Sequence, residues 1–422
     1  MKVPSRFAQK FTGESAITAL MKDLGEAITS QDPDICMLGG GNPAVIPEAA
    51  ETFYAEAQAL LQDESFTQSV GYYSSPQGNK RFIAVLADFF KTHYGWDIGP
   101  ENIALTNGSQ NSFFYLFNVL AGEMADGSHK KILFPLSPEY VGYMDLGLSA
   151  DMFTSHKPSI EYLDGQQFKY RLNVDELSID DDIAAICVSR PTNPTGNVIT
   201  DEELELLDQL AQQHNIPLII DNAYGFPFPG AIYIDAKLTW HNNIILGMSL
   251  SKLGLPGLRT GIVIANEDII NAVSRLNGIT CLSPNNIGAG LLTKLIDDKR
   301  ILSLRDDHIR PFYQQKMANA LALAQQTFSG LPVHIHKPEG AFFLWLWFET
   351  LPINSKELYQ RLKDKKVYII PGEDFFVGMD VQWQHQYQCI RVSYALSDEQ
   401  LERGLAIIAA ELRSLIAVKS KP

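Results

Sequence analysis

Cysteine is scarce in this sequence, with four residues among 422. They are far apart and form no CxxC pair: Cys36, Cys187, Cys281 and Cys389. A disulfide framework or a cysteine-rich zinc site needs closely spaced pairs of cysteines, so neither class of protein fits. We expect four reduced thiols that pack as small apolar side chains.

Long hydrophobic runs are also missing. The longest is FFLWLWF at Phe342–Phe348, and a helix needs roughly 20 apolar residues to cross a bilayer. The N-terminal stretch MKVPSRFAQKFTGES has positive charges with no apolar run behind them, whereas a secretory signal needs both. The sequence therefore predicts a soluble cytoplasmic protein.

Positive charge is in short supply. Lysine and arginine number 34 against 49 acidic residues, which gives a net charge of −15. An acidic chain repels a phosphate backbone, so a nucleic-acid partner is not expected. The nine histidines show no HExxH or similar spacing, and no metal site is expected.

The rest of the composition is that of an ordinary globular protein, with 45% hydrophobic and 20% charged residues. The length exceeds what one hydrophobic core usually supports, so two domains are expected. Short apolar runs alternate with amphipathic helical patterns along the middle of the chain, which predicts an α/β domain with a mostly parallel sheet. The expected strands are 102–106, 131–136, 184–190, 216–223, 243–251 and 261–266.

The pattern changes near residue 300, where a smaller α+β domain is expected. Its elements are helices over 305–328, 355–363 and 398–417, together with the strand-like runs 341–348 and 367–372. The predicted organisation has three parts: an N-terminal arm that joins the small domain (1–50), a large domain (51–300) and a small C-terminal α+β domain (301–422).

Polar motifs follow several of the expected strands, and ligands of open α/β sheets bind at that edge. TNGSQNS places Gly108, where the backbone can approach a ligand closely, before Ser109 and Gln110 at a helix start suited to an anion. RPTNPTG holds Asn193 between two prolines, and IIDNAYG ends a strand on Asp221. A plain turn or helix cap also explains each motif when it is read alone.

The stretch SLSKLGLPGLRTG adds a lysine, Lys252, after another apolar strand. A lysine in a dry pocket near other cations becomes a usable nucleophile. Ser249, Ser251 and Arg259 around it can hold a phosphate. A phosphate site, a lysine for a carbonyl and a buried carboxylate, Asp221, for a ring nitrogen together describe pyridoxal 5′-phosphate (PLP).

From LGGGNP to CIRVSYALS the sequence resembles the class I/II aminotransferase family of fold-type I PLP enzymes. The resemblance implies a large domain with a mostly parallel seven-stranded sheet flanked by helices, plus the smaller α+β domain. It implies that Lys252 forms a Schiff base with the cofactor and that Asp221 pairs with the pyridine nitrogen. It also assigns the remaining cofactor contacts: Asn193 and Tyr224 at the 3-hydroxyl oxygen, Tyr140 stacked on the ring, and Ser109, Gln110, Ser249 and Arg259 at the phosphate.

The resemblance also implies a homodimer with shared active sites. Tyr73, in GYYSSPQG, matches a tyrosine that reaches the neighbouring subunit's phosphate, although Tyr72 beside it is an alternative. Arg391 matches the arginine that binds the substrate α-carboxylate, together with the backbone amide near Gly40 and Gly41. These features predict an enzyme that transfers an amino group between amino acids and 2-keto acids.

The substrates are indicated by resemblance alone. Segments such as LGGGNPAVIPE and HKPEGAFFLWLWF resemble the branch of the family that acts on L-valine and pyruvate. The alternatives are an aminotransferase for other aliphatic or aromatic amino acids, a PLP-dependent β-lyase, a ligand-sensing regulator and a non-catalytic descendant. Arg275 and Arg300 are candidates for a second carboxylate-binding arginine, which would favour a dicarboxylate substrate.

Overall fold

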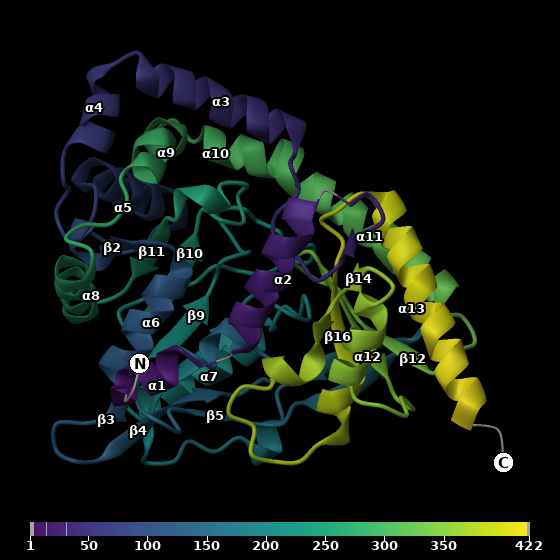
Figure 1. The fold of residues 1–422 in the computed structure, drawn as a ribbon. Coiled ribbons are helices and arrows are strands. Elements are labelled where there is room, and N and C mark those ends of the chain that lie inside the picture. Colours follow the sequence, from purple (N-terminus) through teal and green to yellow (C-terminus); the bar gives the residue numbers. More distant parts are fainter. Residues whose placement is uncertain (1–3, 14, 31, 420–422) are drawn as a thin grey trace.

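The computed structural model describes residues 4–13, 15–30 and 32–419, which form two main sheets with helices packed around them (Figure 1). The larger sheet has eight strands, seven in the order β2-β11-β10-β9-β8-β4-β3 with β5 also paired to β4. Their bounds are β2 (Ile103–Thr106), β3 (Gly122–Glu123), β4 (His129–Phe134), β5 (Phe153–Ser155), β8 (Ile183–Ser189), β9 (Leu218–Asp221), β10 (Ile244–Ser249) and β11 (Gly261–Ile264).

Most of this sheet is parallel, as predicted. The pairings that β10, β9, β8, β4 and β5 make among themselves are all parallel, whereas β11 runs antiparallel to both of its neighbours, β10 and β2. The sheet has eight strands where seven were expected, and the predicted strand ranges miss two of them, the three-residue β5 and the two-residue β3, which pairs antiparallel with β4. Two residues are too short to leave a periodic pattern in the sequence.

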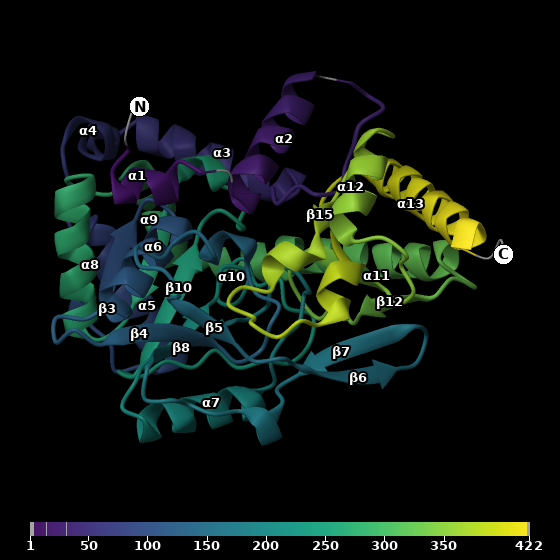
Figure 2. The ribbon, with the colours of Figure 1, turned by 60° about the horizontal axis from the view of Figure 1, so that its bottom comes forward.

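Both faces of the larger sheet are covered, which explains why its strands are continuous apolar runs. Leu218 and Ile220 of β9 pack in one apolar cluster, and Ile219 between them packs in another. Helices α5 (Lys80–Tyr94), α7 (Asp201–Gln213) and α9 (Ile287–Asp297) contribute to the first cluster. Helices α6 (Ser109–Leu120) and α8 (Glu267–Thr280) contribute to the second. Figure 2 shows α7 beneath β8.

The predicted capping box fixes the start of α7. The Glu203 backbone N–H donates to the Thr200 hydroxyl at 3.1 Å, and the Thr200 N–H donates to the Glu203 carboxylate at 2.9 Å. This helix therefore begins directly after the RPTNPTG turn and holds that turn at the end of β8.

The second sheet has six strands in the order β15-β16-β13-β12-β7-β6. Their bounds are β6 (Ser159–Leu163), β7 (Gln167–Arg171), β12 (Val333–His336), β13 (Phe343–Phe348), β15 (Ile370–Pro371) and β16 (Cys389–Ser393). Helices α11 (Arg310–Thr327), α12 (Ser355–Lys363) and α13 (Asp398–Lys419) pack around it, and a π-helical turn (Leu304–Ile309) joins α10 (Arg300–Ser303) to α11.

One part of this sheet comes from the middle of the chain. The β6–β7 hairpin pairs with β12 through β7, and Figure 2 shows it beside that strand. The hairpin falls within the range predicted for the large domain, so the two sheets do not divide the chain at a single residue. The domain bounds 1–50, 51–300 and 301–422 remain a prediction.

The N-terminal segment lies outside the larger sheet. Helices α1 (Arg6–Phe11) and α2 (Ala16–Ser30) lead to β1 (Cys36–Met37), which pairs in parallel with β14 (Val367–Tyr368). The chain then passes to α3 (Pro47–Leu61) and α4 (Glu64–Gly71). No helix in the described ranges is both long and apolar enough to span a membrane.

Candidate active site

A cavity of about 140 Å³ opens at the carboxyl edge of the larger sheet. The residues at this edge come from loops that follow β2, β4, β8, β9 and β10, which is where ligands of open α/β sheets bind. The cavity is lined by Ser109, Gln110, Tyr140, Ser189, Pro191, Asn193, Asp221, Ala223, Tyr224, Ser251, Lys252 and Arg259. Nine of these twelve are residues that the sequence predicts for the cofactor.

Lys252 lies in this cavity directly after β10. Its ammonium group donates a hydrogen bond to the Gly41 carbonyl oxygen at 2.7 Å and lies 5.4 Å from the centre of the Tyr224 ring. Burial, with the positive charge of Arg391 as a second cause, lowers the pKa of Lys252 to about 8. A lysine with this pKa holds far more free amine near neutral pH than an exposed lysine does.

Asp221 is the last residue of β9, and its carboxylate is held by two donors. The Tyr143 hydroxyl donates to Oδ2 at 2.5 Å, and the Ala223 backbone N–H donates to Oδ1 at 3.0 Å. Burial raises the pKa of this carboxyl. A positively charged group in the cavity would stabilise the ionised form, and a protonated ring nitrogen is such a group.

An anion cradle forms where α6 begins. Gly108 precedes the helix with φ +97°, so the backbone can turn its amides toward the cavity. The Arg259 guanidinium lies against this turn, with Nη2 3.5 Å from the Asn107 carbonyl oxygen and Nη1 3.4 Å from the Ser251 hydroxyl. Ser249 stands behind Ser251 and accepts its backbone N–H at 3.1 Å.

We expect Gly108→Ala to weaken cofactor binding at least about tenfold, because it disturbs this cradle in two ways. A Cβ at Gly108 would lie 2.1 Å from Nη2 of Arg259, and a side chain strains a backbone with φ +97°. Gly127→Ala is the matched control, because Gly127 has φ +85° and a Cβ there would meet no atom within 4 Å. Titration of each apoprotein with PLP measures the effect, and equal affinity in the two variants would contradict the assignment.

Arg391, in β16, lies next to the cavity and is almost fully buried. Its Nη1 donates to Oδ1 of Asn193 at 2.6 Å and its Nη2 to the Gly39 carbonyl oxygen at 2.8 Å. The guanidinium also stacks 4.1 Å from the centre of the Phe343 ring. Burial lowers the pKa of Arg391 to about 10, so the group remains charged at neutral pH.

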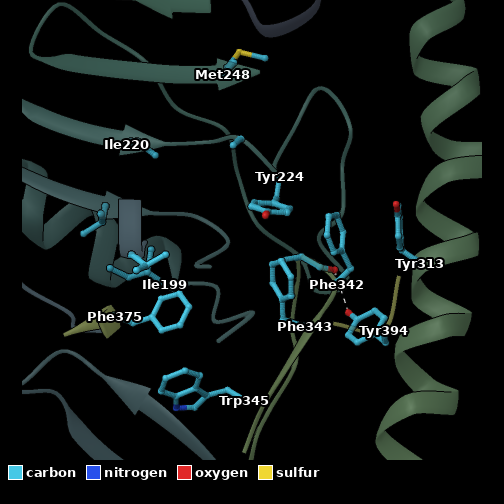
Figure 3. Close-up of a cluster of buried hydrophobic side chains, with 14 of the residues drawn as sticks. Ile199, Ile220, Tyr224, Met248, Tyr313, Phe342, Phe343, Trp345, Phe375 and Tyr394 are labelled. Carbon is cyan, nitrogen blue, oxygen red and sulfur yellow. Dashed lines mark hydrogen bonds between the residues drawn. The ribbon is translucent and has the colours of Figure 1, made fainter. Parts of the chain in front are cut away.

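Two buried polar atoms next to the cavity have no hydrogen-bond partner among the described residues, the Tyr224 hydroxyl and Nε of Arg391. Buried donors without partners are rare, so a ligand with oxygen acceptors is expected there. Figure 3 shows Tyr224 facing Phe342 and Phe343, an aromatic wall that leaves its hydroxyl at the edge of the cluster. The cradle, Asp221, Lys252 and these free donors fit a phosphorylated pyridine aldehyde.

Residues 34–408 match the family described as aminotransferase class I and II. The chain belongs to this aminotransferase family. The valine–pyruvate aminotransferase of Escherichia coli K12 is 51% identical over 408 residues, which cover 97% of each chain. The solved valine–pyruvate aminotransferase of Salmonella typhimurium LT2 superimposes with a TM-score of 0.87 at 47% identity, covering 95% of this chain and 99% of that one. The aspartate/prephenate aminotransferase of Thermus thermophilus is 24% identical over 92% of this chain and 90% of its own.

Membership in the family confirms three predictions from the sequence. The chain has the fold of these enzymes, it is an aminotransferase, and PLP is its cofactor. The individual residue assignments are a separate matter and remain predictions. The part of the chain that the structure describes has no cluster of histidine, cysteine or carboxylate side chains that could hold a metal ion.

Several predicted residues lie outside the cavity lining. Tyr73 and Tyr72 are 80% and 69% exposed on the surface of the single chain. Gly108 and Ser249 support the cradle from behind, and Gly41 reaches the site through its carbonyl oxygen. Neither candidate for a second substrate arginine reaches the cavity: Arg275 is exposed on α8, and Arg300 pairs with Glu56 and Asp298.

Sequence reasoning missed the groups that hold the predicted residues in place. Tyr143, which bonds Asp221, is three residues after Tyr140 in the quoted SPEYVGY motif and lies on a short 3₁₀ turn, Val141–Tyr143. The Gly39 carbonyl and the Ser189 hydroxyl were missed as well. The spacing of Tyr143 was available as a signal, but nothing in the sequence indicates which of the two tyrosines hydrogen-bonds Asp221.

Proposed function

We propose that this aminotransferase exchanges an amino group between L-valine and pyruvate, giving 3-methyl-2-oxobutanoate and L-alanine. The observation that carries the choice of substrates is the 51% identity, over 97% of both chains, with the valine–pyruvate aminotransferase of Escherichia coli. The chemistry is supported by the cavity itself, which Lys252 and Asp221 line and beside which the buried Arg391 bonds Asn193 of the lining.

In this proposal each predicted residue contacts a different part of the cofactor. Lys252 binds its aldehyde carbon, Asp221 pairs with its ring nitrogen, and Tyr140 packs on its ring. Asn193 and Tyr224 contact its 3-oxygen. The phosphate is held by the amides after Gly108 and by Ser109, Gln110, Ser249, Ser251 and Arg259, whose positions around α6 support this role.

The bound cofactor supplies an electron-accepting ring that stabilises negative charge on the substrate α-carbon. Arg391 binds the α-carboxylate with its free Nε side, together with the backbone amide near Gly40 and Gly41, a segment that contacts Lys252 through the Gly41 carbonyl oxygen. With the cofactor bound, the Lys252 amine would serve as the general base, taking the proton from the substrate α-carbon at Nζ. The keto acid uses the same groups in reverse, which predicts ping-pong kinetics.

The positively charged groups at the cavity favour a substrate whose side chain carries no charge. A dicarboxylate substrate needs a second cation, and the positively charged groups at the cavity in the described ranges already have roles in this proposal: Lys252 and Arg259, which line it, toward the cofactor, and Arg391, beside it, toward the α-carboxylate. An apolar pocket separates valine from alanine by only about 1–3 kcal/mol per methylene, so some activity on related aliphatic amino acids is expected.

Steady-state assays with a panel of donors test this proposal. We expect the highest kcat/KM for L-valine with pyruvate, and equal amounts of 3-methyl-2-oxobutanoate and alanine as products. Preference for aspartate or an aromatic amino acid would retain the aminotransferase and replace the substrates. Ammonia release in place of a second amino acid would indicate a β-lyase.

We also propose a homodimer that shares its active sites. Exposed apolar side chains gather on α3, α4, the turn after α4 and the end of α8, and Figure 1 shows α4 and α8 on the side of the molecule far from α13. They are Tyr54, Leu61, Phe66, Val70, Tyr72, Tyr73, Ile279 and Leu282. Monomeric proteins rarely expose so many apolar side chains on one side, so a second copy is the expected cover. A cytoplasmic location is part of the same proposal, because the four cysteines are free thiols.

Tyr73→Phe should lower the affinity for PLP about 10–100-fold, which is the loss of one hydrogen bond to a charged phosphate. Tyr72→Phe is the matched control and should bind PLP as the wild type does. Both variants are titrated with PLP as dimers, after sedimentation has established the oligomeric state. A loss in Tyr72→Phe alone would transfer the role to Tyr72, and a monomeric wild type would reject the shared site.

A further inference from the structure

A chain of buried oxygen atoms leads from Asp221 to a second carboxyl group. The Tyr143 hydroxyl, which donates to Asp221, lies 3.5 Å from the Ser189 hydroxyl. The Ser189 Oγ is hydrogen-bonded to Oε2 of Glu139, and the Ser189 backbone N–H donates to Oε1 at 2.9 Å. Glu139 precedes Tyr140 in the chain and does not line the cavity.

The surroundings of Glu139 contain acids and no base. Its side chain is almost fully buried, and its backbone N–H donates to the Phe375 carbonyl oxygen at 2.9 Å. The titratable groups that face it are Asp221, Cys187 and Tyr143, and the Tyr140 backbone N–H is also hydrogen-bonded to its carboxyl group. No lysine, arginine or histidine of the described ranges forms an ion pair with Glu139. Burial raises the pKa of Glu139 to about 8, with the charge of Asp221 as a further cause.

The direction of the hydrogen bonds depends on whether Glu139 carries a proton. An ionised Glu139 requires the Ser189 O–H to point toward it, which leaves two carboxylates in one dry region with a single hydroxyl proton turned toward Asp221. A protonated Glu139 donates to Ser189, which can then donate to Tyr143, which donates to Asp221. In this second arrangement every O–H along the chain points toward Asp221 and stabilises its charge.

We propose that Glu139 is a positioning residue that remains protonated at neutral pH and heads a chain of hydroxyl donors, through Ser189 and Tyr143, that keeps the negative charge of this region on Asp221. Its value to catalysis rests on the proposed function, because a charged Asp221 matters where a ring nitrogen is to be held protonated. The protonation of Glu139 itself can be measured without any amino-acid substrate.

Infrared difference spectroscopy of wild type against Glu139→Gln tests the proposal directly. At pH 7 we expect the substitution to remove the carbonyl stretch of a protonated carboxylic acid, and in the wild type this band should fade as the pH rises through about 8. Glu56→Gln is the control, because Glu56 pairs with Arg300 at 2.7 Å and should lose a carboxylate band instead. Loss of a carboxylate band in Glu139→Gln at pH 7 would overturn the proposal.

Unfolding measured against pH gives a second test. A carboxyl with a pKa of 4.5 when unfolded and about 8 when folded keeps its proton longer in the folded state. The wild type should therefore lose stability relative to Glu139→Gln between about pH 4.5 and pH 8, and no further above that range. Parallel stability curves would overturn the proposal. If Glu139→Gln fails to fold, the infrared titration of the wild type decides. A protein that passes both tests but does not transaminate valine would refute only the proposed function.

Discussion

Replacing Lys252 with alanine is expected to slow transamination by at least about 10³-fold, which is the scale of a lost general base together with a lost covalent attachment. Lys252 is the only lysine that lines the cavity in the described part of the chain, so no neighbouring amine can replace it. PLP should remain bound through the phosphate cradle and Asp221, but without the absorption band of a lysine-bound cofactor. A single turnover with L-valine, followed by absorbance, measures the rate.

Two comparisons make this result specific to the amine. Lys91→Ala removes an exposed lysine on α5 and should leave the rate unchanged. A small primary amine added to Lys252→Ala should restore part of the rate, because it can move the same proton from solution. Wild-type turnover in Lys252→Ala, with PLP retained, would refute the role of Lys252.

Asp221→Asn is expected to lower kcat by about 10²–10³-fold. Breaking a buried charge pair by removing one partner costs about 3–5 kcal/mol, and each 1.4 kcal/mol is a factor of about ten. The neutral amide keeps the shape of the side chain: its oxygen can still accept from the Ala223 N–H, and its NH2 group can donate to the Tyr143 hydroxyl oxygen. What it removes is the charge that we propose holds the ring nitrogen protonated, so the loss should fall on the proton-transfer step.

Tyr143→Phe tests the hydrogen bond to Asp221 separately from the charge of Asp221. It removes the hydroxyl that donates to Asp221 but keeps the carboxylate and the ring that stacks on Phe134, 5.5 Å away. Its loss should be smaller, about 10–100-fold, because one hydrogen bond to a charged group is worth about 1.5–3 kcal/mol. Both variants are compared in kcat after saturation with PLP. A larger loss in Tyr143→Phe than in Asp221→Asn would reverse the assigned order.

The larger sheet could be predicted from the sequence because its strands are buried on both faces. Runs such as IPLIIDNA contain enough consecutive apolar residues to identify a strand without knowledge of its neighbours. The site followed, because polar residues at the ends of parallel strands must meet at one edge. Lys252, Asp221 and Asn193 are far apart in the chain and line the same cavity.

The parts that could not be predicted depend on contacts that leave no local pattern. The β6–β7 hairpin joins the second sheet by pairing Gln167 with Ile335, a partner that no spacing reveals. The Tyr143 and Glu139 side chains turn inward because of a 3₁₀ turn and a loop, where side-chain direction does not follow a fixed period. Tyr73 is exposed on one chain, and its predicted partner is a second copy.

The most direct test of the account is to mix the PLP-loaded enzyme with L-valine in the absence of any keto acid and to follow the cofactor's absorption. We predict that the band of the lysine-bound cofactor disappears as pyridoxamine phosphate and 3-methyl-2-oxobutanoate form in equal amounts, and that added pyruvate restores the band. A band that L-valine leaves unchanged, while another amino acid converts it, would contradict the proposed substrate. An enzyme that shows no such band after addition of PLP would contradict the site built around Lys252.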